Sequence, residues 1–159
     1  RSLIVASLDH NQMAELYVVR SELEGLAARL AARHATEEEV RLLREFVEED
    51  KGRLGDPSAL SRTNRRFHRQ VHLASHNRYL VQQLDLVYRS MALMTTTSLA
   101  AEGRSERALK EHEAIVEAIS NGDADAAQSE LKGHISRAYE ARLRRDAEAA
   151  ADANGVSAD

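Results

Sequence analysis

Three histidines in this sequence stand where they could bind a buried metal ion. His68, His112 and His134 each fall within or at the edge of the apolar stripe of a different predicted helix, and Asn64 precedes His68 by one turn. Buried imidazoles that converge from separate helices need a common polar partner, and a divalent metal ion is the simplest one. A single inward histidine is more often an ordinary core residue, but three histidines and an amide together favour a metal.

Helical phase selects the side chains that would bind this ion. At about 100° per residue, Asn64 lies inside the buried face of its helix and His68 at the flank, whereas His72 rotates outward. His112 lies near the centre of its stripe, and His134 lies within the apolar arc of its own helix. We therefore predict Asn64, His68, His112 and His134 as ligands of zinc, with nickel, manganese, cobalt and iron as alternatives.

An arginine stands on the apolar face of the first predicted helix. Buried there, Arg20 needs an anion, because an unpaired guanidinium costs several kcal/mol to bury. Its partner is either Glu24, one turn later, or the carboxylate of a ligand whose other end reaches the metal, and the two readings can coexist. Tyr88, Thr95 and Ser98, beside the stripe of the fourth predicted helix, could line the same cavity.

Two other functions are alternatives to a metal site that binds a small carboxylate. An open metal position could activate water in a DinB-like helical enzyme. No Asp or Glu lies in clear phase with the histidines to serve as a base, so we expect no enzyme. In the other alternative, a metal-free structural dimer, the histidines simply fill the core.

The composition limits which fold classes and binding partners are possible. With 159 residues, 43% hydrophobic, one Pro and abundant Ala, Leu, Glu and Arg, the chain fits one all-α domain. It has no Cys, so thiolate ligands are excluded. A net charge of -4 disfavours nucleic-acid binding by these residues alone. No apolar run is long enough for a signal peptide or a membrane span, and we expect a cytoplasmic protein.

Capping signals and periodicity predict an antiparallel bundle of about six helices. Thr36 and Glu39 have the capping-box spacing, and Asp56 precedes a proline suited to the first turn of a helix. Asn77 can cap the fourth helix and Ser105 the fifth. The expected helices cover about 12–34, Thr36 to Gly52, Asp56 to near Ser75, Asn77 to before Gly103, Ser105 to Ser120, and a sixth after the break at 121–123.

We expect these helices to form one domain over residues 12–146. Residues 1–11 are interpreted as a linker, or the end of a missing upstream domain. Residues 147–159 offer little to bury and are expected to form a disordered tail.

Three segments carry a resemblance to a known family. They are "ELYVVRSELEGLAARLAA" from residue 15, "NRRFHRQVHLASHNRYL" from residue 64, and "EHEAIVEAISNGDADAAQSELKGHI" from residue 111. Together they resemble the FCD domain, the ligand-binding domain of GntR-type transcription regulators of the FadR subgroup. The third segment is the most specific, because it combines His112, the Asn-Gly-Asp break and His134 at the family's spacing.

The resemblance implies a metal site, an effector and a domain architecture. In the family an acidic residue, a histidine one turn later and two further histidines bind the metal, and these positions correspond to Asn64, His68, His112 and His134. Asn64 departs from the usual Asp, which makes the site more positive by one unit and favours an anionic effector. The family's effectors are small organic acids, its members are homodimers, and a winged-helix domain upstream binds the DNA.

Overall fold

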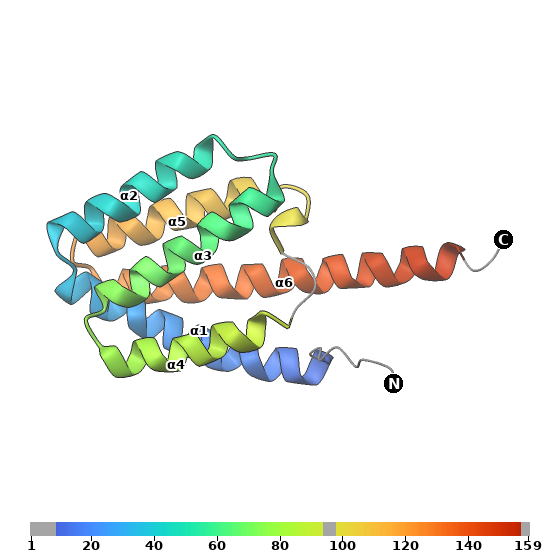
Figure 1. Ribbon diagram of the computed structural model, residues 1–159, viewed down its shortest axis with the longest axis horizontal. Coiled ribbons are helices and arrows are strands. Elements are labelled where there is room, and N and C mark those ends of the chain that lie inside the picture. Colours follow the sequence, from blue (N-terminus) through green and yellow to red (C-terminus); the bar gives the residue numbers. More distant parts are fainter. Residues whose placement is uncertain (1–8, 94–97, 157–159) are drawn as a thin grey trace, which may run out of the picture.

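The protein is built almost entirely from helices. The computed structural model describes residues 9–93 and 98–156, and within these ranges the chain forms six α-helices and one 3-10 turn (Figure 1). The elements are α1 (His10–His34), α2 (Glu37–Lys51), α3 (Pro57–Ala74), α4 (Arg78–Met91), η1 (Ser98–Ala100), α5 (Arg104–Ser120) and α6 (Ala124–Val156). The predicted all-α bundle of about six helices is confirmed.

The helix starts follow the capping signals except at α5. The side chains of Thr36 and Glu39 form the predicted capping box of α2, and Asp56 caps α3 ahead of its proline. The prediction that Ser105 caps the fifth helix is wrong. Gly103 is the N-cap, with φ at 70°, a left-handed conformation that glycine adopts without strain. Ser105 instead donates a hydrogen bond to the carbonyl of Leu99.

The fourth helix is shorter than expected. It ends at Met91, and Ser98 opens the separate turn η1 instead of lying on α4. Thr95 lies outside the described residues.

The long helices α1 and α6 pack against each other over the largest contact in the molecule, and α5 also lies along α6. Figure 1 shows α2 and α5 on one side of α6 and α1 and α4 on the other. Gly25 permits the close approach of α1 to α6, because a Cβ at this position would lie 2.6 Å from Cγ of Lys132. The main apolar core joins all the α-helices except α4 around Leu43, Phe67 and Ile115, each fully buried. This core fixes the inner faces of α3, α5 and α6.

The end of α6 differs from the sequence-based expectation. Where a disordered tail is expected from residue 147, the structure has helix to residue 156, and Figure 1 shows the last turns running past the other helices. Residues 147–155 are exposed. Their abundant Ala favours helix by intrinsic propensity, without burial of an apolar face. In the described part of the chain, no helix has the length and apolarity to cross a membrane.

Candidate metal centre and adjoining cavity

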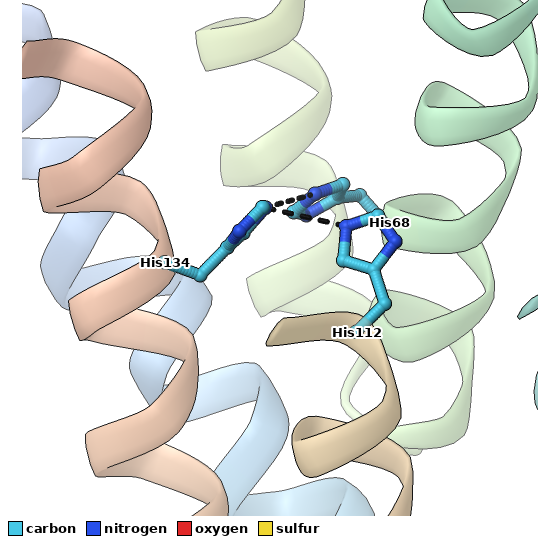
Figure 2. Close-up of side chains that lie close together, drawn as sticks. All are labelled: His68, His112 and His134. Atoms are coloured by element: carbon cyan, nitrogen blue, oxygen red, sulfur yellow. Dashed lines mark hydrogen bonds between the residues drawn. The ribbon is translucent and has the colours of Figure 1, made fainter. Parts of the chain in front are cut away.

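The histidine triad (His68, His112 and His134) meets at one point inside the bundle. His68 comes from α3, His112 from α5 and His134 from α6, and Figure 2 shows the three rings turned toward one another. Nε2 of His134 lies 3.2 Å from Nε2 of His68 and 3.3 Å from Nε2 of His112. All three side chains are buried, with at most 3% of each residue exposed. The ring of Phe67 stacks on His112 at a centroid distance of 4.0 Å and fixes its plane.

Two of the imidazoles have a carboxylate on the opposite ring nitrogen. Nδ1 of His68 lies 3.1 Å from Oε2 of Glu24, and Nδ1 of His134 lies 2.7 Å from Oε1 of Glu111. A carboxylate at Nδ1 favours the proton there and leaves the lone pair on Nε2. Burial lowers the pKa of all three imidazoles, that of His134 to about 4, so they are neutral near pH 7.

This arrangement fits a metal ion. The Nε2 lone pairs of His68 and His134 face each other, which is unfavourable unless a cation or proton lies between them. Two nitrogens bound to tetrahedral zinc at about 2.0–2.1 Å stand about 3.3–3.4 Å apart, close to the two separations measured from His134. Oδ1 of Asn64, on the same helix as His68, is also buried and has no hydrogen-bond partner among the described residues.

A cavity of about 280 Å³ adjoins the triad. Of the triad, only His134 is among the described residues that line it. The other predicted site residues on its wall are Arg20, Asn64, Tyr88 and Ser98. The wall carries three further arginines, Arg65, Arg104 and Arg142, and no Asp or Glu among its described residues. Such a lining favours an anionic occupant.

Both sequence-based readings of Arg20 are compatible with the structure. Its Nε lies 3.4 Å from Oε2 of Glu24, and its Nη2 donates to the hydroxyl of Tyr88, which in turn donates to Oε1 of Glu24. Burial raises the pKa of Tyr88, so its hydroxyl stays protonated and can make this bond. Arg20 therefore has an internal partner and also faces the cavity.

Sequence reasoning missed several residues around the triad. His72 is 2% exposed and its Nε2 bonds to Glu24, contrary to the outward rotation predicted for it. The reason is that α1 and α4 cover this side of α3 with Glu24 and the ring of Tyr88. Arg104 was not singled out, although it opens α5 and bonds to Glu111.

Two acidic residues contact the histidines, each from a different helix, so helical phase did not reveal them. Glu24 contacts His68 and His72, and Glu111 contacts His134. Glu24 follows Arg20 by one turn within the apolar stripe, which is a signal of burial. Glu111 does lie on a different face of α5 from His112, and it is α6 that brings His134 to it.

The comparisons with known proteins agree with this geometry. The family model of the FCD domain matches residues 15–137, which is most of the chain. The chain belongs to the FCD family. The expectation drawn from the three sequence segments is thereby confirmed.

Curated relatives of this FCD domain are transcription regulators. It is 31% identical over 135 residues to a probable D-xylose utilization operon transcriptional repressor of Paenarthrobacter nicotinovorans, covering 83% of this chain and 58% of the relative. It is 30% identical over 122 residues to the galactonate operon transcriptional repressor of Escherichia coli K12, covering 76% and 53%. The chain thus spans little more than half the length of these relatives. They are regulators rather than enzymes, in agreement with the expectation of a non-enzymatic domain.

A solved structure shares the fold of this FCD domain. McbR/YncC of E. coli superposes with a TM-score of 0.76 at 16% identity, covering 86% of this chain and 66% of the other. At that identity the likeness concerns the fold alone.

Proposed function

We propose that this FCD domain senses a small organic acid that binds beside a divalent metal ion. The observation that carries the proposal is the position of His134, which belongs both to the histidine triad and to the wall of the arginine-lined cavity. Acid and ion would therefore be neighbours.

The proposed metal ligands are Asn64, His68, His112 and His134. Three neutral nitrogens and a neutral amide oxygen suit zinc, with nickel, manganese, cobalt and iron as alternatives. When bound, the ion supplies positive charge and open coordination positions next to the cavity. Glu24 and Glu111 orient two of the imidazoles from behind, a supporting role that raises their strength as donors.

The acid would occupy the cavity between the metal ligands and Arg20. The planar guanidinium of Arg20 suits a carboxylate, and the hydroxyls of Tyr88, Thr95 and Ser98 are the proposed neutral contacts. A volume of about 280 Å³ fits a small molecule. Because one relative is the galactonate operon repressor of E. coli, sugar acids are the first class to test.

The acid would act on DNA only through a winged-helix domain of the intact regulator. The triad joins α3, α5 and α6, so ligand binding at this point biases the packing of three helices at once. These helices would carry the signal to the DNA-binding domain.

We further propose that the intact protein is a homodimer. Exposed apolar side chains lie on α1 and α4, which contact each other. They are Val18, Val19, Leu26, Tyr79 and Leu86, with 38–72% of each residue exposed. Exposed apolar side chains on two helices in contact suit packing against a second copy of the chain. Analytical ultracentrifugation should give twice the chain mass, and Leu86→Glu should shift the protein to the monomer.

Metal content and acid binding test the proposal together. The purified chain should contain close to one divalent ion by mass spectrometry, and calorimetry should detect binding of D-galactonate or another sugar acid but not of the uncharged D-galactose. Arg20→Gln should weaken acid binding with the metal retained, and His112→Ala should weaken both. A chain without metal at every pH tested, whose His112→Ala variant binds acids normally, would rule the proposal out.

A further inference from the structure

Two arginines on the cavity wall are connected to the triad by buried carboxylates. In each case a glutamate contacts an arginine of the cavity on one side and a triad histidine on the other. The two connections are Arg20–Glu24–His68 and Arg104–Glu111–His134, named here the first and second relay.

The first relay is fully enclosed. Glu24 is 0% exposed, and its Oε2 lies 3.4 Å from Nε of Arg20 and 3.1 Å from Nδ1 of His68. Its other oxygen accepts from the hydroxyl of Tyr88 and contacts His72. The Glu24 carboxylate is thus shared between an arginine of the cavity and a histidine of the triad.

The second relay has the same order of groups. Nη2 of Arg104 donates to Oε1 of Glu111 at 2.5 Å, and the same oxygen lies 2.7 Å from Nδ1 of His134. Nη2 of Arg104 also lies 3.2 Å from Nδ1 of His134, but this is not a hydrogen bond when that nitrogen donates its proton to Glu111. Arg137 contacts the other oxygen of Glu111 from the outside. Neither relay uses an exposed ion pair, so solvent weakens them little.

We propose that the two relays couple acid binding in the cavity to metal affinity at the triad. This inference rests on the proposed function and adds its regulation. When no acid is bound, each arginine attracts its glutamate and weakens the interaction of that glutamate with the histidine. When an acid pairs with Arg20 or Arg104, the glutamate interacts more strongly with its histidine, and the histidine becomes a stronger metal donor. Metal binding must then strengthen acid binding by the same factor.

A double-mutant cycle on the first relay tests the coupling with Co²⁺ alone as the probe. Arg20→Gln removes the positive charge and so imitates an Arg20 that is neutralised by a bound acid. Glu24→Gln removes the charge of the shared carboxylate at nearly constant shape. Co²⁺ affinity is measured by absorption titration on the 159-residue chain. Arg69→Gln is the control, because Arg69 lies on the same helix as His68, outside the observed lining of the cavity, and pairs with Asp85.

The expected results are specific in sign. Glu24→Gln weakens Co²⁺ binding by about 10–100-fold. Arg20→Gln strengthens it by roughly 3–10-fold in the wild-type background and changes it less than about twofold when Glu24 is already Gln. Arg69→Gln changes it less than about twofold. The d–d spectrum should keep its shape in Arg20→Gln, since no ligand is removed.

Two outcomes overturn the coupling. One is an equal gain from Arg20→Gln with and without Glu24, which would mean a direct effect of charge across space. The other is no gain at all. If a first-relay variant fails to fold by circular dichroism, the cycle of Arg104→Gln and Glu111→Gln gives the same test. A wild-type chain that binds no Co²⁺ would instead contradict the proposed function itself.

Discussion

Replacing His134 by alanine tests the metal centre most directly. Nε2 of His134 is within 3.3 Å of both other triad nitrogens, and the residue also forms part of the cavity wall. In His134→Ala the remaining donors would be two imidazoles and a neutral amide, which are too few for tight binding of zinc. We expect the variant to fold, because Glu111 keeps its contacts with Arg104 and Arg137.

The size of the effect follows from linkage. With free zinc at about 1,000 times the dissociation constant, binding stabilises the folded state by about 4 kcal/mol. For a domain of this length, 1 kcal/mol shifts the unfolding midpoint by about 2–4 °C, so zinc should raise the midpoint of the wild type by about 8–16 °C. In His134→Ala this rise should fall to about 2 °C or less.

Differential scanning calorimetry with zinc and with a chelator measures this rise. His34→Ala is the control, since His34 is an exposed residue in the last turn of α1, remote in sequence from every triad position. It should keep the full zinc-dependent rise. A wild-type midpoint that does not respond to zinc, or a His134→Ala variant with an undiminished rise, would refute the metal centre and favour histidines that only fill the core.

Three further results are expected. Asn64→Asp should strengthen zinc binding by roughly tenfold, because an anionic oxygen replaces a neutral one. Competition with a chromophoric chelator measures this affinity, and an unchanged value would contradict the proposed role of Asn64. Phe67→Ala should lower the free energy of unfolding, measured with urea, by about 3–5 kcal/mol, because the ring is fully buried and stacks on His112. A loss below about 1 kcal/mol would contradict this packing. Partial burial raises the pKa of Glu111, but hydrogen bonds from His134 and Arg104 outweigh it and set the pKa at about 2. Its stabilisation is therefore complete above about pH 4.5 and lost as the pH falls toward 2, a slope that urea titrations should find weakened in Glu111→Gln.

Much of the fold is predictable because local rules determine it. Apolar periodicity and the caps at Thr36, Asp56 and Asn77 locate the starts of three helices. The inward phase of His68 and His112 on their helices follows from the same periodicity. These features depend on residues within a few positions of one another, which is the range that a single sequence reveals.

The rest of the site depends on how helices are rotated against each other. The contact of Glu24 with His68 joins α1 to α3, and that of Glu111 with His134 joins α5 to α6. His72 shows the limit most clearly, because its phase on α3 points away from the main stripe and yet α1 and α4 cover it. Ser98 could not be placed on η1, because helical periodicity gives no information about a 3-10 turn.

The burial of the triad has a kinetic consequence. His134 belongs to the observed wall of the cavity, so the cavity offers an ion one route to the triad, while His112 lines a separate small hollow. A molecule lodged in the cavity obstructs that passage in both directions. Its presence would slow escape of the ion by this route as well as oppose it thermodynamically, so the residence time of the ion should lengthen as the fraction of filled cavities rises.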